Sequence, residues 1–188
     1  MPKKITVLLG SPRRNGNSDT LAASFSKGAA ESGFKSNSIR VNGLKIGGCI
    51  DCRRCWSTKK AHCFLNDDMK DVYAEIDNSD VIVFTTPLYF YSWSSQIKPV
   101  WDRLLPYFHA NSKIDLKGRR IVLIAAAGDD DPSCFDGLKK SFELSCEFAK
   151  WEIAGLLLAT GLHEAGAAQA SEEWMRLAFD MGKKLGGA

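Results

Sequence analysis

Short apolar runs alternate along the chain with segments in which apolar residues recur every three or four positions. The runs predict five β-strands, because a strand covered by helices on both faces is apolar throughout. They lie at residues 5–9, 36–42, 81–85, 121–127 and 153–160. The periodic segments predict five helices, at about residues 18–32, 69–76, 96–108, 135–149 and 174–185. This alternation predicts an α/β fold, a doubly wound five-stranded parallel sheet with helices on both faces.

The pattern suggests no division into domains. It contains no internal repeat, linker or low-complexity segment, so we expect a single domain over residues 1–188. Residues 44–65 lack a clear period, and we expect a loop there. Pro99 fits the helix at 96–108 only if that helix begins near Gln96, since proline is tolerated in a first helical turn.

Composition excludes several classes of protein. Hydrophobic residues make up 45% of the 188 positions and charged residues 25%, as in ordinary globular domains. The net charge of +3 is too small to argue for nucleic-acid binding. The longest apolar runs are far shorter than a membrane span, and the N-terminal residues do not read as a signal peptide. We therefore expect no nucleic-acid partner, no membrane association and a cytoplasmic location.

Candidate chemistry gathers in the loops that follow the strands. In doubly wound sheets, ligands bind beyond the carboxyl ends of the strands, near the point where the strand order reverses. The loops of interest therefore follow Leu9, Thr85 and Ala127.

The first loop, at residues 10–18, has the composition of a phosphate site and opens a helix. A helix N-terminus offers unpaired N–H groups and partial positive charge. Ser11, Asn17 and Ser18 add short polar side chains, and Arg13 can grip two phosphate oxygens at once. The loop matches neither the dinucleotide-binding nor the triphosphate-binding glycine motif. A polar turn with a serine cap is the alternative.

The second loop, at residues 86–94, holds four aromatic residues, Tyr89, Phe90, Tyr91 and Trp93. A planar ring could stack on such a run. Hydrophobic anchoring or a subunit interface is the alternative. A ligand that carries both a phosphate and a flat ring would suit both loops.

These motifs together resemble the flavodoxin-like flavoproteins that include the NADPH-dependent FMN reductases and the iron–sulfur flavoproteins. The residues that carry the resemblance are Gly10-Ser11-Pro12-Arg13, Asn17-Ser18, Asp67-Asp68-Met69, Ser79-Asp80-Val81-Ile82, Thr86-Pro87-Leu88-Tyr89, Lys98, Asp102-Arg103 and Lys117-Gly118-Arg119. The resemblance implies a bound FMN. Its phosphate would be held by Ser11, Arg13, Asn17 and Ser18. Its ring would lie against Pro87, Leu88, Tyr89, Phe90 and Tyr91, with Gly128 closing the edge.

The third loop is acidic at Asp129, Asp130 and Asp131, where relatives often carry glycines. Carboxylates near a flavin edge would repel the 2′-phosphate of NADPH. We therefore hypothesise that NADH or a protein donor serves better than NADPH. A solvated acidic turn without influence on the donor is the alternative.

Four of the six cysteines follow one another closely, at Cys49, Cys52, Cys55 and Cys63. Thiolates are the ligands of iron–sulfur clusters, and short spacings let one loop wrap a cluster. The spacing looks like that of the iron–sulfur flavoproteins, which implies a [4Fe–4S] cluster close to the flavin. The alternatives are cluster-free thiols and a zinc site in which His62 replaces one thiolate.

The other two cysteines, Cys134 and Cys146, lie at helical spacing, and we expect them to be inert. The four-cysteine loop is also basic, with Arg53, Arg54, Lys59 and Lys60. Such a surface could dock an acidic electron carrier such as a ferredoxin. An ordinary solvated loop is the alternative.

The function that the resemblance implies is FMN-dependent oxidoreduction. Electrons would come from NAD(P)H or ferredoxin and pass through FMN, with a cluster as relay, to a flavin, quinone or similar small acceptor. A non-enzymatic electron carrier and a flavin-free binding module are the alternatives. The resemblance and the aromatic second loop also lead us to expect a homodimer or homotetramer.

Overall fold

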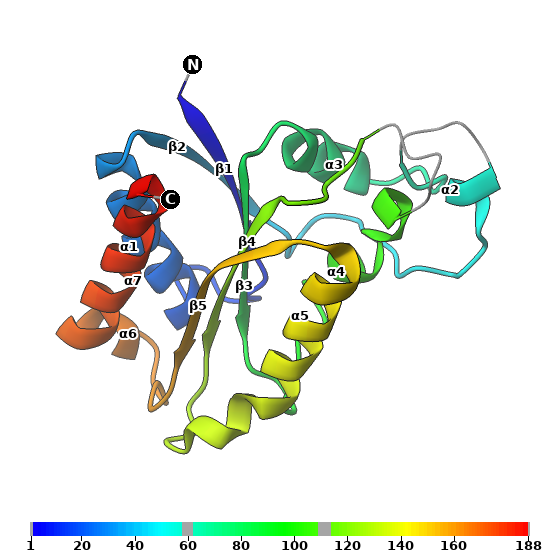
Figure 1. Cartoon of the computed structure of the whole chain (residues 1–188). Helices are drawn as coiled ribbons and strands as arrows, with labels where there is room; N and C mark the ends of the chain where they lie inside the picture. The colour runs from blue at the N-terminus through cyan, green and yellow to red at the C-terminus, as the bar shows by residue number, and fades with distance from the viewer. Residues whose placement is uncertain (1, 58–61, 109–113, 188) are drawn as a thin grey trace.

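A five-stranded parallel sheet organises the chain in the computed structural model, which describes residues 2–57, 62–108 and 114–187. The strands follow the order β2-β1-β3-β4-β5 (Figure 1). Their bounds are β1 Lys3–Leu9, β2 Phe34–Arg40, β3 Val81–Pro87, β4 Arg120–Ala126 and β5 Glu152–Ala159. From β1 the chain turns first to β2 on one side and later to β3 on the other, so the strand order reverses at β1. The predicted doubly wound fold is confirmed, with the strand order of flavodoxins.

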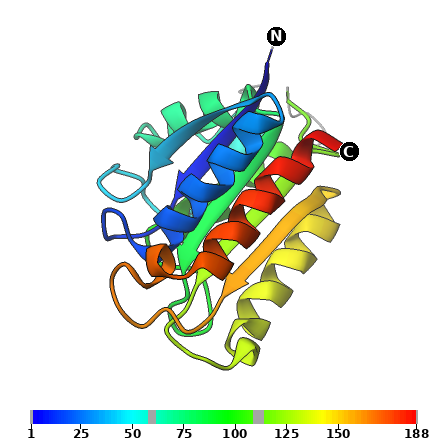
Figure 2. The same ribbon diagram turned by 90° about the vertical axis from the view of Figure 1, so that its left-hand side faces the viewer.

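Helices cover both faces of this sheet. Helices α1 and α7 lie side by side on one face (Figure 2), and α3, α4 and α5 lie on the other (Figure 1). The helix bounds are α1 Asn17–Glu31, α2 Arg54–Ser57, α3 Met69–Asp77, α4 Lys98–Asp102, α5 Asp136–Ala149, α6 Ala167–Ala170 and α7 Glu172–Lys184. Three 3-10 turns complete them, η1 Leu105–Phe108, η2 Pro132–Phe135 and η3 Leu185–Gly187. No helix in the described residues is long and apolar enough to span a membrane.

The central strands are apolar over most of their length because their side chains alternate between two separate cores. Val81 and Val83 of β3 pack in the cluster beneath α1 and α7. Ile82 and Phe84, between and after them, pack in the cluster beneath α3, α4 and α5. Each face therefore buries its own half of the same run, as expected for a covered parallel strand.

Helices α1 and α7 pack with their backbones in direct contact. A Cβ placed on Gly28 would lie 1.9 Å from the carbonyl oxygen of Phe179, and one on Gly182 would lie 2.0 Å from that of Phe25. Only glycine permits such an approach. This contact fixes α1 against α7. The N-terminus of α1 lies at the carboxyl end of β1.

The continuous helix predicted over residues 96–108 is wrong. Helix α4 covers only Lys98–Asp102, and η1 follows it. Pro106 explains the break, since proline lacks an N–H and its ring clashes with the carbonyl four residues earlier. Ile97, Val100 and Leu104 of this segment are still buried, and Trp101, Leu105 and Phe108 are half-buried. The periodicity therefore indicated the buried side correctly and the helix length incorrectly.

Smaller differences concern the edges and loops. Strand β2 runs over Phe34–Arg40, two residues earlier than the predicted 36–42, because its pairing with β1 begins at Lys3 opposite Phe34. Helices α2 and α6 were not predicted, and each has four residues.

Candidate functional site

A cleft opens at the carboxyl ends of the strands, where ligands bind in doubly wound sheets. Its volume is about 780 Å³ including the open mouth, in the range of small-molecule sites. The walls come from the loops after β1, β3, β4 and β5. The predicted residues that line it are Ser11, Arg13, Asn17, Ser18, Pro87, Leu88, Tyr89 and Gly128.

The phosphate end of this cleft is the start of α1. The helix begins at Asn17, and its N-cap, Gly16, has no side chain to occupy the free N–H groups of the first turn. Ser18 lies in that turn, and its hydroxyl is buried without a hydrogen-bond partner among the described residues. A buried hydroxyl in this state fits a missing anion. The residues present therefore suit the phosphate of FMN.

Arg40, at the end of β2, braces the loop from behind. Its Nη1 donates to the carbonyl oxygens of Ser11 at 3.4 Å and Arg13 at 3.3 Å. Its Nη2 lies 2.7 Å from a carboxylate oxygen of Asp19. Burial raises the pKa of that carboxyl, and Arg40 acts against the rise. These contacts hold the loop in shape without using the hydroxyl of Ser18.

Asn17 lines the cleft, but its side chain is engaged elsewhere. Its amide nitrogen donates to the carbonyl oxygens of Leu162 at 3.1 Å and Glu164 at 2.9 Å. Its amide oxygen accepts from the N–H of Ala168 at 3.1 Å. The side chain thus ties α1 to the segment after β5, and what Asn17 can offer a phosphate is its backbone N–H.

The aromatic loop divides at Tyr89. Pro87, Leu88 and Tyr89 line the cleft, whereas Phe90 and Tyr91 point outward with 99% and 64% of their surface exposed. The N–H groups of Tyr89 and Ser92 bond to each other's carbonyl oxygens at 3.1 and 3.0 Å, which closes a two-residue turn. Phe90 and Tyr91 adopt φ angles of 46° and 60°, which are unfavourable for bulky residues. These two predicted residues are therefore not part of the cleft lining.

The segment after β5 completes the cleft and was missed from the sequence. Leu162 and His163 line the cleft beside Gly128. A Cβ on Gly128 would lie 3.5 Å from the Cα of His163, so the two loops pack closely. The predicted fifth strand could have indicated this segment, because parallel strands end at the same edge of a sheet and β5 lies next to β4.

In the acidic turn, two carboxylates accept hydrogen bonds from backbone N–H groups of the turn, and the third reaches His163. Asp131 accepts from the N–H of Ser133 at 2.9 Å, and this bond lowers the pKa of its carboxyl. Asp129 accepts from the N–H of Asp131 at 3.0 Å. Asp130 points to solvent with an oxygen 3.3 Å from Nε2 of His163. Of the three carboxylates, Asp130 is therefore the one that contacts a residue of the cleft lining.

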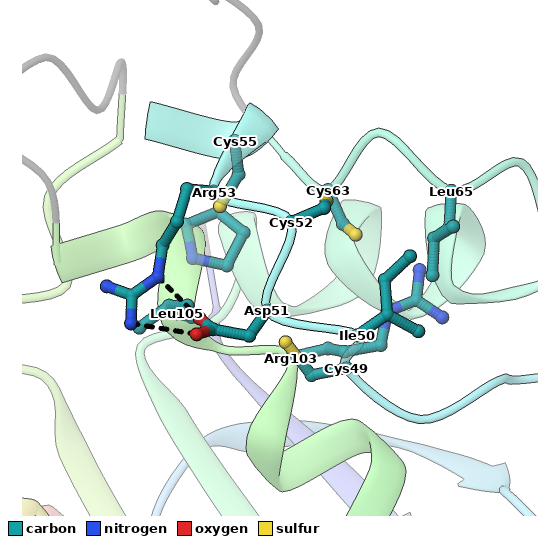
Figure 3. Close-up of a pocket in the computed structure, with 11 residues that line it drawn as sticks. Cys49, Ile50, Asp51, Cys52, Arg53, Cys55, Cys63, Leu65, Arg103 and Leu105 are labelled. Atoms are coloured by element: carbon teal, nitrogen blue, oxygen red, sulfur yellow. Dashed lines mark hydrogen bonds and ion pairs between the residues drawn. The ribbon is translucent and has the colours of Figure 1, made fainter. Parts of the chain in front are cut away.

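The four clustered cysteines line a second cavity (Figure 3). Cys49, Cys52, Cys55 and Cys63 are all free thiols, and burial together with the neighbouring thiols raises the pKa of Cys55. No three Cys, His, Asp or Glu side chains in the described parts of the chain are arranged around a single ion. A [4Fe–4S] cluster needs no such arrangement, because each thiolate binds a different iron. The donor set therefore suits a cluster.

His62 does not lie among these thiols. Its ring stacks on Tyr73 with centroids 4.4 Å apart, and its Nε2 lies 2.9 Å from a carboxylate oxygen of Asp77. The arrangement therefore lends no support to a zinc site that uses His62. Away from this cavity, Cys134 and Cys146 are buried, and burial raises the pKa of Cys146 to about 12, as expected of inert thiols.

Arg103 directly follows α4 and lines the cysteine cavity. Its guanidinium contacts Asp67 through two nitrogens, at 2.5 and 3.0 Å, and the carbonyl oxygen of Gly47 at 3.1 Å. Burial alone would raise the pKa of Asp67, yet the bonds from Arg103 and the N–H of Gly47 lower it overall. The pair thus joins both ends of the cysteine loop to α4. No described residue lines both this cavity and the cleft.

The basic character of the cysteine loop is partly neutralised within the loop. Arg53 lies 2.5 Å from a carboxylate oxygen of Asp51 and stacks over Trp56, and Arg54 lies over the ring of Phe64. Lys59 and Lys60 lie outside the described residues.

Comparisons with known proteins show which proteins this sequence is similar to. The family model for NADPH-dependent FMN reductase matches residues 3–133. An iron-sulfur flavoprotein of Archaeoglobus fulgidus is 31% identical over 125 residues, covering 66% of this chain and 56% of that protein. One of Methanosarcina thermophila is 28% identical over 100 residues, covering 53% and 51%. The chain thus spans little more than half the length of these relatives.

A solved structure supports the fold alone. The NAD(P)H:quinone oxidoreductase from Methanothermobacter marburgensis superimposes with a TM-score of 0.73 at 16% identity, covering 98% of this chain and 96% of that one. The two chains therefore share their fold. Since the family model matches more than half of the residues, the chain belongs to the NADPH-dependent FMN reductase family.

Proposed function

We propose that this chain is an FMN-dependent oxidoreductase that takes electrons from NAD(P)H. The observation that carries the proposal is the cleft. There the buried hydroxyl of Ser18, in the first turn of α1, has no hydrogen-bond partner in the part of the chain that the structure describes. Ser11, Arg13 and the N–H groups of that turn would hold the phosphate. Pro87, Leu88 and Tyr89 would contact the flavin ring. The bound flavin would supply the redox chemistry, accepting an electron pair and releasing electrons singly.

The protein's own contribution is position and electrostatics. Arg40 holds the loop after β1 in shape through hydrogen bonds to its carbonyl oxygens. The N–H of Leu88 donates to the carbonyl oxygen of Ala126 at 2.8 Å and so joins the two loops that would flank the ring. Asp130 and His163 at the mouth would influence which nicotinamide approaches. We propose that the negative charge of Asp130 favours NADH over NADPH.

We also propose that Cys49, Cys52, Cys55 and Cys63 hold a [4Fe–4S] cluster that relays single electrons. Two observations support this: four free thiols surround one cavity, and the chain is similar to iron-sulfur flavoproteins. Unpaired cysteines also favour a reducing compartment, which agrees with a cytoplasmic location.

A ferredoxin is the second donor that we consider, and it would approach the basic cysteine loop. Arg53→Glu together with Arg54→Glu should slow reduction by ferredoxin at low ionic strength, because charge complementarity speeds protein association. Reduction by NADH should be unaffected. An unchanged ferredoxin rate would remove this route.

We propose that the chain works as a homodimer or homotetramer. Phe90 and Tyr91 are exposed large hydrophobic residues on a turn whose backbone is unfavourable for them. Such residues are retained where they bury against a partner. Sedimentation should show an oligomer that Phe90→Ser weakens, and a monomer with full FMN affinity would contradict the proposal.

The test of the main proposal is anaerobic purification followed by flavin, iron and sulfide analysis and by turnover. We expect stoichiometric FMN and steady oxidation of NADH with a quinone or free flavin as acceptor. FMN without turnover would favour the non-enzymatic carrier. Failure to bind added FMN would refute the proposal and favour a flavin-free module. Flavin absorbance without iron and sulfide would remove the cluster alone.

A further inference from the structure

The guanidinium of Arg103 is the most buried charge that lines the cysteine cavity. The residue is 1% exposed, and Nη1 and Nη2 are both engaged, with Asp67 and the carbonyl oxygen of Gly47. Its Nε is buried and has no hydrogen-bond partner among the described residues. An N–H of a buried cation is costly to leave without an acceptor. Arg103 therefore brings to this cavity one strong N–H donor that no described protein group accepts.

Among the described side chains that line this cavity, the four thiols are the acceptors that no arginine pairs with. The cavity's one carboxylate, Asp51, is paired with Arg53 on the exposed side. Asp67 accepts from the other end of the guanidinium and holds it in place. The field of Cys63 acts on Arg103 as well and adds to the rise of its pKa, which burial opposes.

We infer that Arg103 is a positioning residue that donates its Nε–H to a sulfur of the group held by the four cysteines and so raises the reduction potential of that group. This inference rests on the proposed cluster. A hydrogen bond to a cluster sulfur stabilises the more negative reduced state, because that state places more charge on sulfur. The forked end of the side chain fixes both ends of the cysteine loop, so the donor is in place before the cluster assembles.

The first measurement leaves Arg103 itself unchanged. Wild-type protein containing arginine labelled with ¹⁵N at Nε is loaded with iron and sulfide, reduced and studied by pulsed EPR. We expect a ¹⁵N hyperfine coupling to the reduced cluster. The coupling should persist in Arg53→Met, which removes the other arginine that lines the cavity. A loaded cluster without this coupling overturns the inference.

The second measurement is the reduction potential. In Arg103→Met the EPR-monitored midpoint should shift to a more negative value than in wild type. The exposed Arg53→Met is the matched control, and its shift should be smaller because solvent screens its charge. An Arg103→Met protein with full iron and sulfide and an unshifted potential overturns the inference. If Arg103→Met does not retain iron, the wild-type ¹⁵N coupling decides.

The same preparations separate the inference from the proposed function. Wild-type protein that binds FMN but takes up no iron and sulfide refutes the cluster, and the inference is then refuted with it. Wild-type protein that holds a cluster without nitrogen coupling leaves the proposed function intact and refutes the role of Arg103 alone.

Discussion

Replacement of Ser18 by alanine tests the FMN cleft through two effects of opposite sign. The hydroxyl is buried in the first turn of α1, at 2% exposure, and has no hydrogen-bond partner among the described residues. Ser18→Ala removes that oxygen and leaves the backbone of the turn unchanged. The flavin-free protein should therefore become more stable, whereas the complex should become weaker.

The magnitudes follow from the state of the hydroxyl in each form. A buried polar group without a partner costs about 1–3 kcal/mol, so the free energy of unfolding of the flavin-free variant should rise by about 1 kcal/mol. For a chain of this length that corresponds to about 2–4 °C in Tm. A hydrogen bond to a charged phosphate contributes about 1.5–3 kcal/mol, so the Kd for FMN should rise about 10- to 150-fold.

The assay is urea denaturation of flavin-free protein, followed by circular dichroism, together with titration of FMN by fluorescence quenching. Ser26→Ala is the matched control, since Ser26 lies on the same helix and its hydroxyl donates to the carbonyl oxygen of Ala22 at 2.9 Å. It should leave the FMN affinity at the wild-type value. An unchanged Kd in Ser18→Ala would refute the role of the hydroxyl. A loss of stability in the flavin-free variant would refute the claim that it lacks a partner.

Three further predictions concern packing, pH and donor choice. Gly182→Ala should lower the free energy of unfolding by about 3 kcal/mol or more in urea denaturation, since its Cβ would meet backbone, whereas Gly187→Ala, with nothing within 4 Å, should change little. The lowered pKa of Asp67 contributes stability above its ordinary value of 3.8, and that stability is lost as pH falls through the lowered pKa. In denaturation across this range the difference between wild type and Asp67→Asn should therefore shrink with falling pH, and a constant difference would contradict the assignment. Asp130→Asn should raise kcat/KM for NADPH relative to NADH about two- to fivefold, and an unchanged ratio would favour a merely solvated turn.

The sheet could be predicted from the sequence because its information is local. A strand covered on both faces carries a continuous apolar run, and β3 and β4 each contain such a run. The edge strand β2 is half exposed and carries a weaker pattern, so its bounds follow from pairing with β1. The break after α4 also had a local signal, the proline at position 106. The prediction followed the apolar periodicity instead and therefore extended the helix too far.

The candidate site was predictable where loops follow strands and not where side chains meet across the fold. Ser11, Arg13 and Ser18 lie in one short segment next to a strand end, and that context placed them in the cleft. His163 lines the same cleft although it lies about 150 residues after Ser11 in the sequence, and no local pattern indicates this. The outward turn of Phe90 depends on two left-handed residues, which composition predicts only for glycine or asparagine.

The two sites share a design that the local sequence does not reveal. Arg40 bonds to backbone carbonyl oxygens of the phosphate loop and to Asp19, and Arg103 bonds to a backbone carbonyl oxygen of the cysteine loop and to Asp67. In each case a carboxylate fixes the guanidinium, and the guanidinium then fixes a loop that has little regular structure of its own. Since the loop conformation is set before a ligand arrives, binding does not have to supply the entropy of ordering it. An irregular loop can thus serve as a precise site when an arginine from a neighbouring element holds its backbone.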